Sequence, residues 1–230
     1  MVYLSIRCKF NKKNYNNMAE NKSNITQNIK IALIGDSGVG KSSIALRYTM
    51  NEFNDNYNST GGASYSTKII QYGNDTIQLD IWDTAGQEKF RSLGRQFYKD
   101  AFIVILVYDI TNKQTFINLS EIWYPELKNS GESNPVIGVA GNKSDQYESE
   151  ETVNEEEARK YSESINGVFE LVSAKTGNNI DILFNDLIEE YYKRNYPEKV
   201  KKILEERDAQ KLQSDKNKED KSHKKKKKFC

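Results

Sequence analysis

A glycine-rich stretch of eight residues has the composition of a phosphate-binding loop. Residues 35–42 read Gly-Asp-Ser-Gly-Val-Gly-Lys-Ser and match the pattern G-x-x-x-x-G-K-[ST]. Glycines let successive backbone N–H groups point toward anionic oxygens, the Lys41 ammonium is a point charge for β- and γ-phosphates, and the Ser42 hydroxyl is a ligand for Mg²⁺. A plain Gly-rich turn with a surface lysine is the alternative. The residues expected to contact the phosphates are Ser37, Gly38, Val39, Gly40, Lys41, Ser42 and Ser43.

Two later motifs concern the base, since the loop alone would equally suit an ATPase or a kinase of small metabolites. Residues 142–145 read Asn-Lys-Ser-Asp and follow an apolar run. The carboxylate of Asp145 can accept hydrogen bonds from the ring N–H and the exocyclic amine of guanine, a pair that adenine cannot supply. Residues 173–175, Ser-Ala-Lys, can offer a backbone N–H to the guanine carbonyl. Each motif alone is common in loops, but their order predicts guanine. The residues expected around the base are Asn142, Lys143, Asp145, Ser173, Ala174 and Lys175.

Composition removes several other kinds of chemistry. Only two cysteines, Cys8 and Cys230, and one histidine, His223, occur, all outside the expected core. A disulfide framework, a cysteine metal site and a catalytic triad with a core histidine are thereby excluded. No apolar stretch reaches the roughly 20 residues that span a bilayer, and no secretory signal is visible, so we expect a cytosolic protein.

Apolar and alternating runs predict the elements that position these motifs. We expect strands at residues 29–34, 63–72, 76–82, 102–108, 136–140 and 168–172. A helix with Ile44, Ala45 and Tyr48 on one face should follow the glycine-rich loop, and Thr152 and Glu155 should form a capping box at the start of a later helix. The last helix has apolar residues at helical spacing and should stop near Pro197. Its apolar positions are Ile180, Leu183, Phe184, Leu187, Ile188 and Tyr191.

These elements predict an α/β fold: a six-stranded mixed sheet with one antiparallel edge hairpin strand, flanked by five helices. Ligands of such open sheets bind at the carboxyl ends of the strands, where all the motifs fall. Length and composition indicate one such domain, residues 29–196, between a flexible extension, residues 1–28, and a basic tail, residues 197–230. Both ends are rich in polar and charged residues, so we expect them to be poorly ordered.

The order of the motifs resembles that of Ras-superfamily GTPases over about residues 29–195. Asp83-Thr84-Ala85-Gly86-Gln87 adds the segment that this superfamily carries between its phosphate loop and its base motifs. Residues 81–91, Ile-Trp-Asp-Thr-Ala-Gly-Gln-Glu-Lys-Phe-Arg, and Tyr108-Asp109-Ile110-Thr111 resemble segments typical of Rab proteins. Residues 59–65, Ser-Thr-Gly-Gly-Ala-Ser-Tyr, are similar to the first switch of the endosomal Rab branch. The resemblance implies a P-loop small G domain that binds GTP and GDP with Mg²⁺.

The resemblance also implies a switch and its catalytic residues. Asp83 can hold Mg²⁺ through water, and Thr60 would supply a second hydroxyl ligand when GTP is bound. Thr60 and the backbone N–H of Gly86 would engage the γ-phosphate, so hydrolysis releases both loops. Gln87 matches the residue that orients the attacking water, with a solvated loop amide as the alternative. Phe53 matches the aromatic that packs against guanine, with a plain core residue as the alternative. Lys41, Thr60 and Gln87 form the predicted catalytic set.

Regulators and effectors are implied as partners. No arginine is placed to reach the γ-phosphate, so unaided hydrolysis should be slow, on the order of 10⁻⁴–10⁻³ per second. A GTPase-activating protein, an exchange factor and a GDP-dissociation inhibitor are therefore expected around a monomeric core. Tyr65, Trp82 and Phe97 match the aromatic trio that Rabs present to effectors, with buried packing as the alternative. Gly61 stands where the branch usually carries an aliphatic residue.

The tail predicts attachment to a membrane. Six of the final ten residues are lysines; since the whole chain carries +1, the other 220 residues carry −5. A run at 224–228 beside Cys230 fits prenylation combined with electrostatic attraction to anionic lipid. A single final cysteine nevertheless departs from the usual Rab and C-a-a-X endings. Met1-Val2 excludes a myristoylation start, and Met18 is an alternative initiation site.

The sequence is compatible with four functions. The first is a hydrolysing Rab-like switch on endosomal or other intracellular membranes, with a cytosolic pool. The second is a guanine-nucleotide-dependent recruitment module that does not hydrolyse, against which Thr60 and Gln87 argue. A Ras-type signalling GTPase is the third. Nucleic-acid binding through the basic tail is the fourth, but the body of the chain offers no matching basic stripe, so we expect no nucleic-acid partner.

Overall fold

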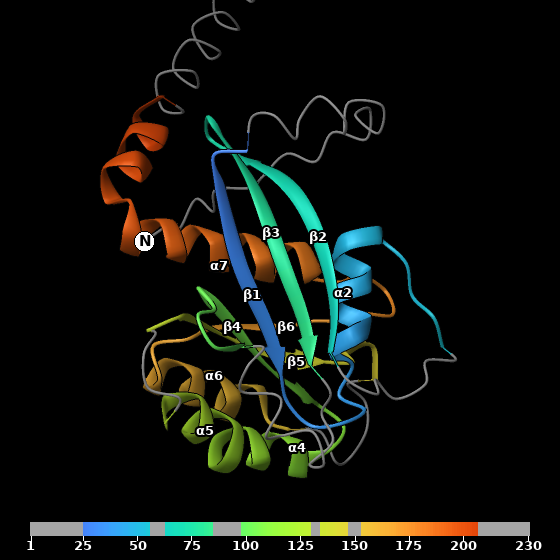
Figure 1. Ribbon diagram of the computed structural model, residues 1–230. Coiled ribbons are helices and arrows are strands. Elements are labelled where there is room, and N and C mark those ends of the chain that lie inside the picture. Colours follow the sequence, from blue (N-terminus) through green and yellow to red (C-terminus); the bar gives the residue numbers. More distant parts are fainter. Residues whose placement is uncertain (1–24, 56–62, 85–97, 130–133, 147–152, 207–230) are drawn as a thin grey trace, which may run out of the picture. The chain divides into compact units, whose positions relative to one another are not determined.

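A computed structural model describes residues 25–55, 63–84, 98–129, 134–146 and 153–206. Six strands of this part form one sheet in the order β2-β3-β1-β4-β5-β6, with β2 and β3 antiparallel and the other pairs parallel. The predicted mixed sheet with an antiparallel edge is confirmed (Figure 1). The strands are β1 (Gln27–Ile34), β2 (Ala63–Tyr72), β3 (Asp75–Thr84), β4 (Ile103–Asp109), β5 (Val136–Asn142) and β6 (Val168–Leu171).

The antiparallel hairpin brings two polar side chains together at its open end. Tyr72 pairs with Asp75, so the turn consists of two residues, and Gly73 supplies the positive φ of 59° that such a turn requires. The unbroken register then sets Ser64 opposite Asp83. Residues directly opposite each other in a ladder point to the same face. A turn nine residues from each of the two side chains thus fixes which hydroxyl lies beside the Asp83 carboxylate.

Five α-helices lie wholly within the described residues up to Asn195, which agrees with the five predicted for the domain. Between α4 and α5 the helix continues through a π-helical turn, η4, and a short 3₁₀ turn, η5, follows β5. The helical elements are α2 (Lys41–Met50), α4 (Lys113–Asn118), η4 (Leu119–Trp123), α5 (Tyr124–Asn129), η5 (Ser144–Gln146), α6 (Glu155–Ser164) and α7 (Ile180–Asn195).

The predicted capping box of α6 is wrong. The helix begins at Glu155 with Asn154 as its N-cap, whose side chain accepts from the backbone N–H groups of Glu156 and Glu157. Asparagine is among the strongest N-caps, so it takes the position that the box pattern assigned to Thr152, a residue outside the described ranges. Glu155 is therefore the first residue of the helix and not the third.

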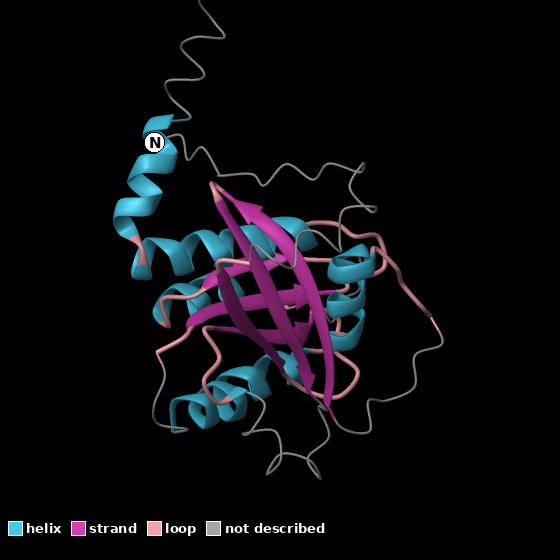
Figure 2. Ribbon diagram, turned by 45° about the horizontal axis from the view of Figure 1, so that its top comes forward, coloured by secondary structure: helices cyan, strands magenta, loops and turns pink. Residues whose placement is uncertain are grey.

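Helices cover both faces of the sheet (Figures 1 and 2). On one face a buried cluster joins β4 residues such as Leu106 to Phe116 of α4 and Ala158 of α6. On the other, the rings of Tyr48 in α2 and Phe184 in α7 stack with centroids 3.6 Å apart. Strands buried on both faces are typical of parallel sheets, and this explains the continuous apolar runs.

The last helix follows its predicted pattern, but the chain after it does not. All six apolar positions named for α7 are buried. Pro197 ends α7 as expected, yet residues 197–206 are again helical, so the prediction of poor order is wrong for this segment. Proline is tolerated in the first turn of a helix, where its missing N–H would have no partner. No helix in the described ranges is both long and apolar enough to cross a membrane.

Candidate functional site

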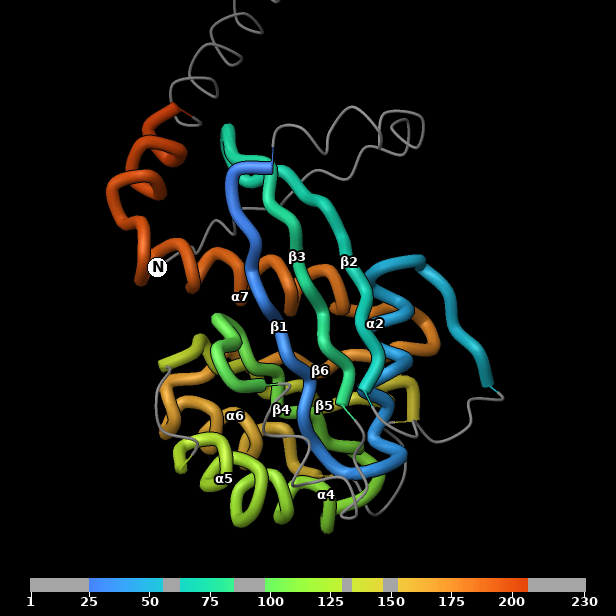
Figure 3. Tube along the Cα trace, viewed as in Figure 1, coloured from blue at the N-terminus to red at the C-terminus, as the bar shows by residue number. Residues whose placement is uncertain are grey.

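The glycine-rich loop joins β1 directly to α2, as the motif requires (Figure 3). Gly35 has a φ of 146°, and a Cβ there would lie 2.2 Å from the backbone oxygen of Val107 in β4. Gly40 has a φ of 95°, and its Cβ would lie 2.2 Å from the Asn142 Nδ2 atom. Any side chain at either position would collide with a neighbouring strand or motif. The loop is therefore held close to the carboxyl ends of β4 and β5.

Lys41, the first residue of α2, is a buried cation. Its side chain is 5% exposed, and Nζ donates to the backbone oxygens of Gly35 at 2.9 Å and Asp36 at 2.7 Å. Burial lowers the pKa of Lys41 to about 8, and the nearby charges of Asp83 and Asp36 oppose this shift. A charge desolvated to this extent interacts strongly with an anion placed beside it.

Ser42, Ser64 and Asp83 converge on one point next to Lys41. Asp83 Oδ2 accepts from Ser42 Oγ at 2.5 Å and from Ser64 Oγ at 3.2 Å. Asp83 Oδ1 is buried and has no hydrogen-bond partner in the described part of the chain. Burial raises the pKa of the Asp83 carboxyl, whereas the Ser42 hydrogen bond and the Lys41 charge lower it.

This oxygen cluster has the chemistry that Mg²⁺ prefers. Magnesium takes oxygen ligands, keeps several waters and is commonly held by one or two carboxylates or hydroxyls together with substrate phosphates. The unpartnered Asp83 Oδ1 and the Ser42 hydroxyl supply such oxygens. No group of three His, Cys, Asp or Glu side chains that could hold a metal occurs among the described residues. A metal at Ser42 and Asp83 would therefore depend on ligands outside these two side chains.

The Asn142 side chain links the phosphate loop to the base motifs. Its Nδ2 donates to the Val39 backbone oxygen at 2.8 Å, and its Oδ1 accepts from the Ala174 backbone N–H at 3.1 Å. Asn142 itself is 2% exposed. One buried amide thus uses a donor and an acceptor to fix three loops from the ends of β1, β5 and β6 relative to one another.

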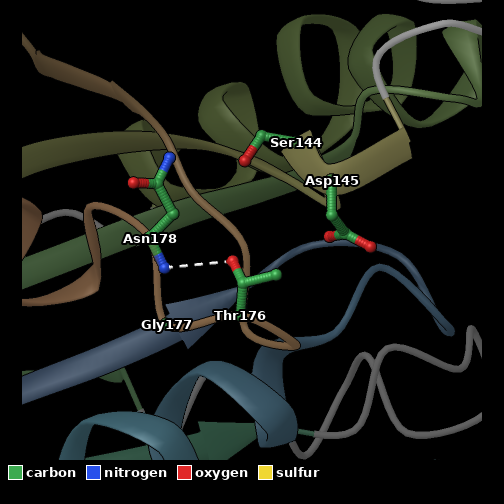
Figure 4. Close-up of a pocket in the computed structure, with 5 residues that line it drawn as sticks. All are labelled: Ser144, Asp145, Thr176, Gly177 and Asn178. Atoms are coloured by element: carbon green, nitrogen blue, oxygen red, sulfur yellow. Dashed lines mark hydrogen bonds between the residues drawn. The ribbon is translucent and has the colours of Figure 1, made fainter.

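The Asp145 carboxylate lies at a pocket of about 520 Å³, within the usual size of ligand sites. Ser144 and Asp145 line one side and residues 176–178 the other (Figure 4). The Ser173 hydroxyl, buried beneath, donates to Asp145 Oδ1 at 2.5 Å. The two base motifs are thereby brought together. Asp145 itself is exposed, so its carboxylate remains accessible to a ligand.

Lys143 reaches back toward β4. Its Nζ donates to Asp109 Oδ2 at 2.5 Å, and Asp109 Oδ1 accepts from both the N–H and the hydroxyl of Thr111. Lys143 has a positive φ of 69°. Asp109 was noted in the sequence only as part of a Rab-like segment, and the structure gives it a role as the acceptor that fixes the Lys143 head group.

Several predicted residues are placed differently or lie beyond the described ranges. Phe53 is partly exposed and not a core residue, and it does not line the Asp145 pocket. Tyr65 is 52% exposed and its ring lies 5.1 Å from that of Trp82, so buried packing is wrong for Tyr65. The predictions for Thr60, Gly61, Gly86, Gln87, Phe97 and Cys230 concern residues outside the described ranges.

Sequence patterns missed two residues that hold the site. Both carboxylate oxygens of Asp36, which lies inside the phosphate loop, accept hydrogen bonds from α4 and η4. Asn118 Nδ2 of α4 donates at 2.6 Å, and Trp123 Nε1 of η4 donates at 2.8 Å. Arg47 of α2 donates to backbone oxygens of Ala174 and Lys175. Asp36 occupies a variable position of the motif and Arg47 lies outside every motif, so no pattern indicated either contact.

Comparison with known proteins gives one consistent result. Residues 30–193 match the sequence model of the Ras family. Human Ras-related protein Rab-22A is 44% identical over 159 residues, which cover 69% of this chain and 81% of the relative. Human Ras-related protein Rab-31 is 42% identical over 159 residues, covering 69% and 80%. Ras-related protein Rab5A of Oryza sativa subsp. japonica is 39% identical over 171 residues, covering 74% and 83%.

Proposed function

The chain belongs to the Ras family, in its Rab branch, and is a small GTPase of membrane trafficking; within that function we propose a Mg²⁺-dependent switch that acts on endosomal membranes. The observation that supports the proposal is the placement of two polar clusters at one edge of the sheet. Lys41 and Asp83, both buried, and Ser42 form a charged cluster that would take the phosphates and the metal. Asp145 and Ser173 form the cluster that would take guanine. The Asn142 amide connects them.

Mg²⁺ would be held by Ser42, Asp83 and Thr60, and would supply positive charge to the β- and γ-phosphates. Ser42 and Asp83 support this assignment through their shared hydrogen bond and the unpartnered Asp83 Oδ1. In a Ser42→Asn variant, calorimetric titration with Mg²⁺ present should give a GTP affinity that falls more than the GDP affinity. Equal loss for the two nucleotides would remove the metal role of Ser42. A Ser164→Asn variant, the same change at an exposed serine at the end of α6, is the control.

Hydrolysis itself would depend on Gln87 orienting water, with Lys41 and Thr60 holding the γ-phosphate. Because unaided turnover of such proteins is on the order of 10⁻⁴–10⁻³ per second, an activating protein is required. We expect Gln87→Leu to bind GTP as the parent does and to lose most of the stimulated phosphate release. Stimulated turnover near the parent rate would instead favour a non-hydrolysing recruitment module or another water-positioning residue.

Effectors and regulators would dock on the hairpin of β2 and β3 and on the adjoining switch segments. The supporting observation is the surface pair of Tyr65 and Trp82, with the Tyr65 hydroxyl donating to Asp80 Oδ1 at 2.8 Å. The Lys30 ammonium lies 5.3 Å from the Trp82 ring. An aromatic pair with an adjacent cation and carboxylate suits a protein partner better than a nucleic acid. A Ras-type signalling role has less support, since the similar proteins are Rabs.

Membrane attachment would come from residues 197–230, outside the G domain proposed at residues 29–196. One lipid chain alone binds marginally, so a prenyl group on Cys230 and the lysine run at 224–228 should act together. Cys230→Ser should move the protein to the cytosol. Replacement of the five lysines by Gln should leave a weaker attachment that raised salt affects less than it affects the parent, because screening acts on the lysine charges. Fractionation combined with mass spectrometry of the C-terminal peptide tests both parts. Unmodified Cys230 on membrane-bound protein would exclude the lipid anchor.

A further inference from the structure

We propose that Arg47 is a positioning residue for guanine recognition, which holds the loop at residues 173–175 against the end of α2. This inference rests on the proposed function, because it adds a residue to the same nucleotide site. Arg47 lies in the last turn of α2, the helix whose first residue is Lys41. Six residues of helix separate the two side chains by about 9 Å along the axis. One rigid element therefore carries both the phosphate-binding lysine and the arginine that contacts the base loop.

The guanidinium of Arg47 makes four hydrogen bonds to carbonyl oxygens. Nε donates to the Ala174 backbone oxygen at 2.8 Å, and Nη2 donates to the Lys175 backbone oxygen at 2.7 Å. Nη1 donates to the backbone oxygen and the side-chain Oδ1 of Asn51, at 3.0 and 3.3 Å. The planar fork of an arginine is suited to two adjacent acceptors, which a lysine ammonium cannot match in one plane.

Fixing these two carbonyls also fixes a backbone donor. In a trans peptide the C=O of one residue and the N–H of the next point in opposite directions. The Ala174 C=O points to Arg47, so the Lys175 N–H points to the opposite side of the same peptide plane. The loop is held further by the Ala174 N–H on Asn142 Oδ1. Arg47 therefore sets the orientation of the backbone N–H groups that are proposed to read the guanine carbonyl.

The stem of the arginine also adjoins the turn that lines the Asp145 pocket. Gly177 has a φ of 85°, and a Cβ at this position would lie 3.5 Å from Arg47 Cδ. Gly177 and its neighbours form one side of that pocket. A shorter or differently shaped side chain at position 47 would consequently withdraw support from both the carbonyls and the pocket-lining turn.

Competition binding against a fluorescent GDP analogue can isolate this role. GDP, 6-thio-GDP and IDP are compared, because 6-thio-GDP replaces the carbonyl by a weaker acceptor and IDP lacks the amine read by Asp145. For Arg47→Met we expect GDP affinity to fall about tenfold and 6-thio-GDP affinity to fall much less. The preference for GDP over IDP should stay within about twofold of the parent value. Arg47→Lys should keep part of the preference for the carbonyl.

The controls separate this inference from the function on which it depends. Arg159→Met removes an arginine whose guanidinium donates to Glu155 on its own helix and lies over the Phe169 ring, and it should change no preference between nucleotides. Wild-type protein that does not prefer GDP over ADP would contradict the proposed function. Suppose instead that Arg47→Met keeps the parent's preference for GDP over 6-thio-GDP, so that its affinity for the two nucleotides falls equally. That result would overturn the proposed role of Arg47 and leave the proposed function standing. If Arg47→Met does not fold, an unchanged carbonyl preference in Arg47→Lys overturns it.

Discussion

The two halves of the proposed nucleotide site are built in opposite ways. The phosphate half, which consists of Lys41, Ser42 and Asp83, buries its charges: Lys41 is 5% and Asp83 1% exposed. The base half, which consists of Asn142, Asp145 and Ser173, joins its polar atoms to one another and to neighbouring backbone while leaving Asp145 exposed.

The difference between the halves is electrostatic. In the phosphate half, burial lowers the pKa of Lys41 to about 8 and raises the pKa of Asp83, so desolvation works against both charges although they attract. A bound polyanion with Mg²⁺ would stabilise the charged forms of Lys41 and Asp83, which desolvation disfavours. The base half needs no such compensation. We infer that the phosphate half supplies most of the affinity and the base half most of the discrimination between nucleotides.

The largest expected effect tests where the affinity comes from. Lys41→Met removes a buried ammonium from the phosphates, and loss of a buried, hydrogen-bonded charge should reduce GDP affinity about 10³-fold. Lys143→Met removes a half-buried lysine next to the base half and should lower GDP affinity only about tenfold. Affinities measured by competition against a fluorescent GDP analogue give the comparison. Equal losses in the two variants would show that the halves do not differ in this way.

The second prediction tests where discrimination comes from. Asp145→Asn replaces an acceptor by an amide that can donate to the second carbonyl of xanthine. GTP affinity should fall roughly 10²-fold while XTP affinity rises above it. The phosphate half should be unaffected, so XTP binding should need Mg²⁺ as GTP binding to the parent does. Competition assays with both nucleotides measure the change. A variant that still prefers GTP would mean that Asp145 does not read the base.

The sequence indicated the polar residues that cluster at the candidate site better than the residues that hold them in place. Ligand chemistry restricts Lys41, Ser42 and Asp145 to particular residue types at fixed spacing, and the structure brings each beside its expected neighbours. Arg47 and Asp36 act through contacts with residues 127 and 87 positions away, so no local pattern reveals them. Their partners depend on how α2 and η4 pack against the ends of the strands.

The fold was predictable because the burial of a residue restricts its type, and the errors in the prediction are confined to two helix boundaries. Apolar runs predicted β4 and β5 because both faces of these strands are buried, and alternating residues predicted β3. The start of α6 was wrong because two residues near it, Thr152 and Asn154, can both cap a helix, and sequence spacing alone does not rank them. The helix at residues 197–206 was missed because Pro197 equally suits a helix end and a first turn.

The third prediction concerns the anchor of the phosphate loop. Trp123→Phe keeps an aromatic ring in η4 but removes the N–H that Asp36 Oδ1 accepts. Loss of one hydrogen bond to a carboxylate should accelerate GDP release about fivefold to tenfold by loosening the loop. Trp82→Phe, which changes an indole in the β2–β3 hairpin, is the matched control. Stopped-flow release of a fluorescent GDP analogue measures both rates. If GDP release from Trp123→Phe is not accelerated, the Asp36 hydrogen bond does not hold the loop, and the contacts of its glycines alone make it rigid.

The smallest expected effect concerns a carboxylate in β6, next to the base half. Unlike the charges of the base half, this carboxylate is disfavoured by burial. Glu170 is half-buried, and burial raises the pKa of its carboxyl; Asp186 adds to the shift and Arg159 opposes it. The folded state therefore binds this proton more tightly than the unfolded state. The resulting stabilisation is complete below the ordinary glutamate pKa of 4.5 and is lost as pH rises through the raised value.

Glu170→Gln should consequently stabilise the protein at neutral pH, by less than about 1 kcal/mol. The amide oxygen can still accept the bond from Asn179 Nδ2, which lies 3.4 Å from Glu170 Oε2, so the substitution removes charge with little change of shape. Urea unfolding of GDP-loaded protein at pH 5, 6 and 7 should give a gain that shrinks as pH falls, because the wild-type carboxyl becomes neutral. Glu163→Gln, an exposed change in α6, should give no pH-dependent gain. A gain that grows toward pH 5, or a loss at pH 7, would mean that the attraction of Arg159 outweighs the desolvation of Glu170.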